Sequence, residues 1–224
     1  MEHKRLTLFA GHYGSGKTNI AVNYALLLAG EGKKVCIADL DIVNPYFRTK
    51  DSAEVLEKAG IDLISPKFAN SNVDLPALPA ESYRLVQDKS TWGIMDIGGD
   101  DRGAYALGRF TPDIIKENDY RMAFVANSCR PLTRTPEDAL EIMQEIEAAC
   151  GLKFTCIVNN TNLGRETTPQ VITDSLGYIE KLCSFSGLPL WMHTAETSVA
   201  NRLPPLNAPV LAMELQEKYF DLPI

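Results

Sequence analysis

The segment 11–18 reads Gly-His-Tyr-Gly-Ser-Gly-Lys-Thr and constrains the possible folds of this chain more than any other segment. It fits the pattern G-x-x-x-x-G-K-[ST] of a phosphate-binding loop, or P-loop. An apolar run of strand length, 6–10, precedes it, and apolar residues at helical spacing over 19–29 follow it. Phosphate binding needs this order of strand, glycine-rich loop and helix. Glycines let backbone N–H groups approach the phosphates, and the helix N-terminus adds partial positive charge.

We expect every residue of this loop to lie at the phosphates of a bound nucleotide. Lys17, a predicted catalytic residue on an exposed part of the loop, should reach the β- and γ-phosphates, and the Thr18 hydroxyl should hold Mg²⁺. The nucleotide-binding residues predicted here are Gly11, His12, Tyr13, Gly14, Ser15, Gly16, Lys17, Thr18 and Asn19.

Beyond the loop, short apolar strands alternate with helical stretches, which predicts parallel βαβ units. The expected strands are 6–10, 34–39, 61–65, 92–97, 121–127, 154–159 and 190–193, and the expected helices are 19–29, 51–59, 80–88, 112–117, 136–150, 169–182 and 210–219. Segments 70–79 and 100–110 are expected loops, and the second should respond to the nucleotide state. We therefore predict an α/β fold of the P-loop NTPase type, a single domain over 1–224. Its mostly parallel twisted sheet should carry helices on both faces, in a Rossmann-like three-layer arrangement.

Composition argues against several classes of protein. The 224 residues are 45% hydrophobic with a formal net charge of −7 and no basic run, so we expect a globular chain without a broad nucleic-acid-binding face. No apolar stretch approaches the roughly 20 residues of a membrane span, and the expected last helix is acidic, so we expect no membrane contact. The loop begins at residue 11, which leaves no room for a removable signal peptide and indicates a cytoplasmic protein.

The five cysteines form no C-x-x-C pair; buried thiols are the preferred interpretation, and a metal site assembled in space is the alternative.

Polar clusters follow three of the expected strands, at the edge where ligands bind in open parallel sheets. These clusters are Asp39-Leu40-Asp41, Asp96-Ile97-Gly98-Gly99 and Asn159-Asn160-Thr161-Asn162. We expect Asp96 to hold Mg²⁺, directly or through water, and Gly99 to bring its backbone to the γ-phosphate. Asp41 is the better candidate for positioning the attacking water and is also a candidate metal ligand, with Asp39 nearer the metal. The sequence does not separate the catalytic roles of Asp39 and Asp41.

Together, the P-loop, Asp39-x-Asp41 and Asp96-x-x-Gly99 resemble the MinD/ParA superfamily, or CobQ/CobB/MinD/ParA nucleotide-binding domain, over nearly the whole chain. This resemblance implies a slow Mg²⁺-dependent ATPase, a switch that acts on an unidentified partner protein. It also implies an ATP-dependent homodimer with ATP at the interface, and adenine contacts from Asn159 and Asn160. The family's loop carries a lysine where this chain has His12, and a glycine where it has Tyr13. In the family, that lysine reaches into the partner's site. Its replacement by His12 therefore weakens one implied property, the coupling of hydrolysis to dimerisation.

Three other hypotheses about the function stay open. The loop also resembles that of the nickel-insertion GTPases, but their guanine-reading N-K-x-D would place Asn162 where an anionic acceptor is needed. A small-molecule synthetase or kinase resembling dethiobiotin synthetase is the second, and a scaffold that binds nucleotide without turnover is the third. Candidate substrate contacts for the second are Asn44, Tyr46, Arg48, Arg109, Arg130 and Arg134.

Overall fold

The computed structural model describes residues 2–41, 52–65, 80–99 and 101–215. Its strands are β1 (Leu6–Ala10), β2 (Val35–Leu40), β3 (Asp62–Ile64), β4 (Trp92–Ile97), β5 (Tyr120–Ala126), β6 (Cys156–Asn159), β7 (Leu190–Glu196) and β8 (Val210–Met213). Its α-helices are α1 (Lys17–Gly30), α2 (Ala53–Lys58), α3 (Arg84–Gln87), α4 (Asp101–Gly108), α5 (Thr111–Glu117), α6 (Pro136–Cys150), α7 (Pro169–Asp174), α8 (Leu176–Ser186) and α9 (Thr197–Ala200). Short 3₁₀ turns are η2 (Ala80–Tyr83), η3 (Pro131–Thr133) and η4 (Gly164–Glu166).

The strands form one sheet in the order β3-β2-β4-β1-β5-β6-β7-β8, and every pair is parallel. The first strand therefore lies near the middle of the sheet, between β4 and β5. All carboxyl ends of the strands point to one edge, so the loop after β1 and the polar residues after β2, β4 and β6 share that edge. This arrangement confirms the predicted parallel α/β fold.

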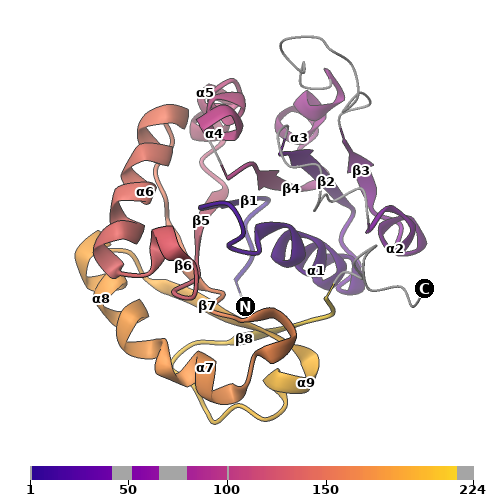
Figure 1. Cartoon of the computed structure of the whole chain (residues 1–224). Coiled ribbons are helices and arrows are strands. Elements are labelled where there is room, and N and C mark those ends of the chain that lie inside the picture. Colours follow the sequence, from indigo (N-terminus) through magenta and orange to yellow (C-terminus); the bar gives the residue numbers. More distant parts are fainter. Residues whose placement is uncertain (1, 42–51, 66–79, 100, 216–224) are drawn as a thin grey trace, which may run out of the picture.

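Helices cover both faces of the sheet, as predicted, because alternate strand residues pack in opposite directions. Leu6 and Leu8 belong to the core formed with α3, α4, α5, α6 and α8, whereas Phe9 belongs to the core formed with α1 and α2. The sheet curves around α1, with β2 and β4 above that helix in the view of Figure 1 and β8 below it. The helix that follows the P-loop is thus held in the interior of the fold.

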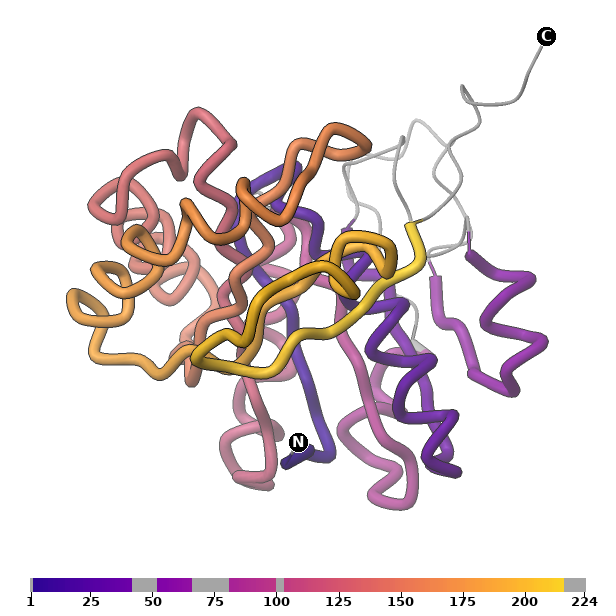
Figure 2. Tube along the Cα trace, turned by 90° about the horizontal axis from the view of Figure 1, so that it is seen from below, coloured from indigo at the N-terminus to yellow at the C-terminus, as the bar shows by residue number. Residues whose placement is uncertain are grey.

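The expected helix over 210–219 is wrong where the structure describes it, because Val210–Met213 is the edge strand β8. Pro209 precedes this segment, and its residues alternate, with Leu211 and Met213 buried and Ala212 exposed. Asn23 of α1 fixes the end of the strand: its amide donates to the carbonyl oxygen of Glu214 and its Oδ1 accepts from the Glu214 N–H, each at 2.9 Å. Figure 2 shows the end of β8, in yellow, beside the indigo α1. Residues 216–219 lie outside the described part of the chain.

Two further expectations are corrected. The expected loop over 100–110 is mostly the helix α4, whose Ala104 and Leu107 pack in the core beneath it. The expected helix over 169–182 is two helices, α7 and α8, because the chain breaks at Ser175. The Ser175 hydroxyl donates to the carbonyl oxygen of Ile172 at 2.7 Å, a local bond that competes with a continuous helix. The expected loop over 70–79 lies outside the described residues, as do Asn44, Tyr46 and Arg48.

Candidate nucleotide-binding site

The loop between β1 and α1 has the backbone geometry that its glycines allow. Gly16 has a left-handed φ of 93°, and a β-carbon there would lie 2.1 Å from the Nδ2 atom of Asn160. Both conditions exclude a side chain at this position. The Ser15 N–H donates to the carbonyl oxygen of His12 at 3.2 Å, which closes the turn.

Lys17 is buried, contrary to the expectation of an exposed loop lysine. It is the first residue of α1, and its Nζ folds back to donate to the carbonyl oxygen of His12 at 3.0 Å. The ammonium group therefore lies over the loop itself, where a bound phosphate would meet it. His12 is half-buried and Tyr13 is half exposed, and the Nδ1 atom of His12 lies 2.9 Å from the carbonyl oxygen of Tyr13. Asn19, also half-buried, lies in the first turn of α1.

The hydroxyl of Thr18 and the carboxylate of Asp96 meet in front of the loop. Thr18 Oγ1 donates to Asp96 Oδ2 at 2.7 Å, joining the start of α1 to β4. A hydroxyl and a carboxylate are both oxygen donors, which suits Mg²⁺. In the described part of the chain, no three His, Cys, Asp or Glu side chains gather closely enough to hold a metal ion. Mg²⁺ ordinarily takes one or two protein oxygens and completes its shell with water and phosphate, so the Thr18–Asp96 pair fits it.

Asp39 and Asp41 stand beside this pair. Asp39 of β2 is directly opposite Asp96 of β4 in the sheet, and both side chains are buried. Asp41 follows the end of β2, and its N–H donates to Asp39 Oδ1 at 3.0 Å. The predicted group of Asp39, Asp41 and Asp96 is thus assembled at one edge of the sheet.

Gly99 lies directly against the P-loop. A β-carbon at Gly99 would be 2.5 Å from the Tyr13 nitrogen and 2.7 Å from its Cα, so the two backbones touch. The turn after β4 therefore reaches the loop only because residue 99 has no side chain.

Asn159 and Asn160, expected at adenine, are both buried and engaged with other parts of the protein. The Asn160 amide donates to the carbonyl oxygen of Ser15 at 2.6 Å, and its Oδ1 accepts from the Thr194 hydroxyl at 2.6 Å. The Asn159 amide donates to Ser175 Oγ at 2.9 Å and contacts His193 Nδ1 at 3.1 Å. These contacts give Asn160 a role in holding the loop; adenine recognition by either residue stays a prediction.

The partners of these asparagines could not be identified from any sequence pattern. His193 is completely buried, and its Nε2 lies 3.1 Å from Asn207 Oδ1. Because Asn207 Oδ1 is an acceptor, Nε2 carries the proton and Nδ1 accepts from Asn159. Burial lowers the pKa of His193 below its usual 6.5, which keeps the ring neutral. Thr194 and His193 belong to the part of β7 nearest the ligand edge, but nothing in their local pattern sets them apart.

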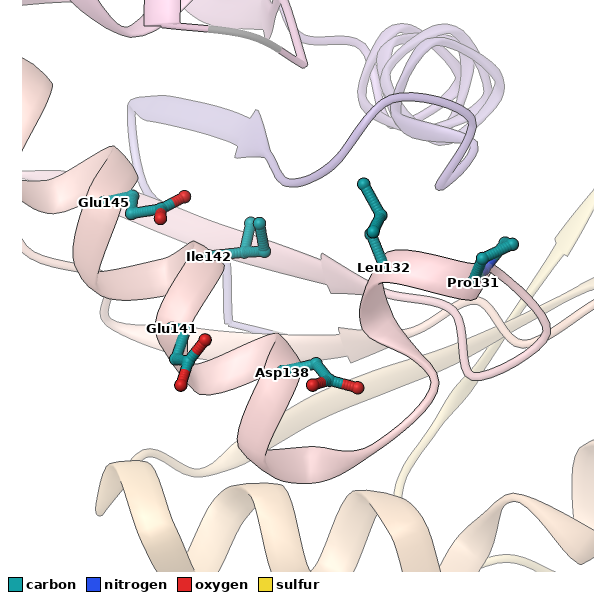
Figure 3. A pocket seen from close by; sticks show the side chains of 6 residues that line it. All are labelled: Pro131, Leu132, Asp138, Glu141, Ile142 and Glu145. Carbon is teal, nitrogen blue, oxygen red and sulfur yellow. The ribbon is translucent and has the colours of Figure 1, made fainter.

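A hollow of about 200 Å³ lies beside the site, between the turn η3 and helix α6. Pro131, Leu132 and Ile142 form its apolar part, and the carboxylates of Asp138, Glu141 and Glu145 rim it along α6 (Figure 3). None of these six lining residues belongs to the predicted site.

Comparison with known proteins shows the fold of this chain. No family model matches it, and no curated protein matches it in sequence. Among solved structures, the cell division protein FtsY of Thermotoga maritima matches with a TM-score of 0.59 and 18% identity, over 85% of this chain and 61% of that one. The signal recognition particle receptor FtsY of Elizabethkingia anophelis, in complex with GDP, gives a TM-score of 0.54 and 15% identity, over 87% of this chain and 58% of that one. The 54 kDa signal recognition particle protein of Aeropyrum pernix, also in complex with GDP, gives a TM-score of 0.53 and 18% identity, over 84% of this chain and 41% of that one.

These likenesses confirm the predicted P-loop NTPase fold. The chain spans about three fifths of the length of the two FtsY chains. At such low identity they show the fold and not the activity. In the described part of the chain, no helix is both long and apolar enough to cross a membrane.

Proposed function

We propose that this protein is a Mg²⁺-dependent ATP-binding protein and slow ATPase, a nucleotide-driven switch that acts on a partner protein. The observation that carries the proposal is the contact between Thr18 and Asp96. It joins a hydroxyl at the start of α1 to a carboxylate of β4, and the preceding residue, Lys17, has its ammonium group on the loop. A lysine, a hydroxyl and a carboxylate in this order along a P-loop and the neighbouring strand are typical of sites that bind a triphosphate together with its metal ion, which supports the proposal.

Each side chain then has a defined task. The loop N–H groups and Lys17 bind the β- and γ-phosphates, and Thr18 and Asp96 hold Mg²⁺, which supplies charge neutralisation at the phosphate oxygens when bound. Asp41 orients the attacking water by accepting a hydrogen bond from it, and Asp39 fixes Asp41 through the hydrogen bond to its backbone. No arginine finger can be assigned from the sequence, so turnover without a partner should be slow.

Preference for ATP is the part of the proposal that rests on Asn162. A guanine reader needs a carboxylate that accepts two hydrogen bonds, whereas the Asn162 amide donates to the carbonyl oxygen of Asn160 at 2.7 Å and its Oδ1 accepts from the Gly164 N–H at 3.1 Å. GTP is the second candidate, because two of the structures with this fold contain GDP.

An ATP-dependent homodimer is the remaining part of the proposal. Tyr13 is exposed and His12 is half-buried, and we expect a second copy to approach the loop at these two residues. His12→Ala should then weaken association of the ATP-bound protein, as measured by light scattering. A His12→Ala variant that associates as well as the unaltered protein would leave His12 with no part in the interface.

Titration with ATP and GTP in the presence of Mg²⁺, followed by measurement of phosphate release, tests the function. We expect tighter binding of ATP, and no triphosphate binding by a Lys17→Ala variant that still folds. A tenfold preference for GTP, about 1.4 kcal/mol, would favour the GTPase reading. Unchanged affinity in Lys17→Ala would contradict the assignment of the loop.

A further inference from the structure

Arg130 occupies a fixed position next to the P-loop. Its backbone follows β5, the strand beside β1, and enters the turn η3. The Arg130 N–H donates to the carbonyl oxygen of Asn127 at 3.1 Å, and the Arg130 carbonyl oxygen accepts from the Thr133 N–H at 3.2 Å. The Thr133 hydroxyl also donates to the Asn127 carbonyl oxygen at 2.8 Å, and both of these side chains are fully buried. The backbone at residue 130 is therefore anchored to the end of β5.

The side chain of Arg130 lies against the middle glycine of the loop. A β-carbon at Gly14 would be 3.7 Å from Arg130 Nε, 3.9 Å from Cζ and 4.0 Å from Cδ. The guanidinium group thus lies next to Gly14 of the loop. Both Arg130 and Gly14 are exposed, so this long side chain can reach past Gly14 toward a phosphate bound at the loop.

The charge of Arg130 is available to a ligand. Within the described residues its guanidinium group makes no ion pair and no hydrogen bond, whereas Arg5 pairs with Glu117 and Arg84 pairs with Asp62. Arg130 is exposed, and among the described residues none of the carboxylates that rim the neighbouring hollow forms an ion pair with it. A guanidinium presents several N–H donors in a planar fork that matches phosphate oxygens.

We propose that Arg130 is a phosphate-binding residue of this site, which contacts the polyphosphate chain of the nucleotide from the side of Gly14. The inference rests on the proposed function, because it assigns a second cationic side chain to the same bound triphosphate. It concerns the phosphates alone, so the contribution of Arg130 is the same whichever base the nucleotide carries. A base-free polyphosphate should gain the same contact.

Calorimetric titration with Mg²⁺ and ATP, GTP or inorganic tripolyphosphate tests the inference. Arg130→Ala should lower the affinity for all three ligands by a similar factor of about ten or more, which is the loss typical of hydrogen bonds to a charged group. Arg130→Lys should restore part of the affinity, because it keeps the charge without the fork. Lys181→Ala is the control, since Lys181 is an exposed cationic residue of helix α8 outside the predicted site, and this variant should bind like the unaltered protein. Affinity should also depend less steeply on salt in Arg130→Ala, an effect that a merely structural role would not produce.

Several outcomes would overturn the inference. If the unaltered protein binds all three ligands and Arg130→Ala binds them equally well, Arg130 has no part in the site and the proposed function stands. If Arg130→Ala loses affinity for ATP but not for tripolyphosphate, Arg130 contacts the base or the sugar instead. If the unaltered protein binds none of the ligands, the proposed function and this inference both fail. Arg130→Gln, which keeps most of the side chain, replaces Arg130→Ala if thermal unfolding shows that the alanine variant is not folded.

Discussion

The side-chain amide of Asn160 donates a hydrogen bond to the carbonyl oxygen of Ser15 across 2.6 Å, and so ties the end of β6 to the P-loop. The Thr194 hydroxyl donates to the other end of the same amide, which fixes its orientation. The strand β5 separates β1 from β6, so the loop is held from a strand that is not its neighbour. The position of the loop therefore depends on a residue 145 positions away in the sequence.

Asn160→Ala should loosen the P-loop. The variant leaves the Ser15 carbonyl oxygen without its buried donor, which should lower the free energy of unfolding by about 1–3 kcal/mol. Affinity for Mg²⁺ and ATP should fall with it, because the loop is no longer held in place. Chemical denaturation and calorimetric titration measure the two effects. Asn162→Ala is the control, since its amide bonds stay within its own loop; a similar loss of affinity in that variant would contradict the assigned role of Asn160.

Gly99→Ala should disturb the same loop from the other side. The new methyl group would lie 2.5 Å from the Tyr13 nitrogen, so either the loop or the turn after β4 must move. We expect weaker ATP binding and a loss of about 1–3 kcal/mol in stability. Gly177→Ala is the matched control. A β-carbon there meets nothing within 4 Å in helix α8, and the substitution should stabilise the protein by about 0.5–1 kcal/mol. Normal ATP affinity in Gly99→Ala would show that the turn does not set the position of the loop.

Asp41→Asn should separate turnover from binding. The amide has nearly the shape of the carboxylate and keeps the backbone N–H that donates to Asp39. It is a poorer acceptor for the attacking water, so phosphate release should slow by about 10²-fold while ATP affinity changes little. Equal losses in turnover and affinity would instead give Asp41 a part in binding the metal ion or in folding.

His193 should make the protein less stable as the pH falls below about 6.5. Burial lowers its pKa in the folded state, whereas the unfolded chain has the usual value near 6.5. Between the folded pKa and 6.5 the unfolded state binds more protons, so its free energy falls relative to the folded state as the pH decreases. Above 6.5 the ring is neutral in both states and contributes no pH dependence. The free energy of unfolding, measured with denaturant at several pH values in this range, should depend less steeply on pH in His193→Gln than in the unaltered protein. An identical dependence on pH in both proteins would contradict the prediction.

Features that depend on neighbours along the chain could be predicted from the sequence. The start of α6 is the clearest case: Thr135 accepts from the Asp138 N–H, Pro136 occupies the first helical position, and Gly151 ends the helix with a left-handed φ of 68°. The strands β1 and β4 were predicted with the bounds that the structure shows. Local backbone preferences and the spacing of apolar residues decide these elements, and a short segment of sequence is enough to show both.

Features that depend on contacts between distant segments could not be predicted. The sequence predicts a helix over 210–219, and only pairing with β7 makes Val210–Met213 a strand. The burial of Lys17 and the contacts of Asn159 with His193 likewise required the assembled sheet.

The sequence by itself determined the glycine-rich loop between β1 and α1, the parallel α/β architecture and the acidic residues at the strand ends, because each follows from residue type and local spacing. Only the tertiary structure decided which side chains hold the loop and which remain available to a ligand. Asn160 has the residue type of a base reader, yet its amide donates to Ser15, whereas Arg130 lies against Gly14 with its charge unpaired among the described residues. The physical reason is that a hydrogen bond or an ion pair is made by whichever groups the packing brings together, and a sequence pattern does not contain that information.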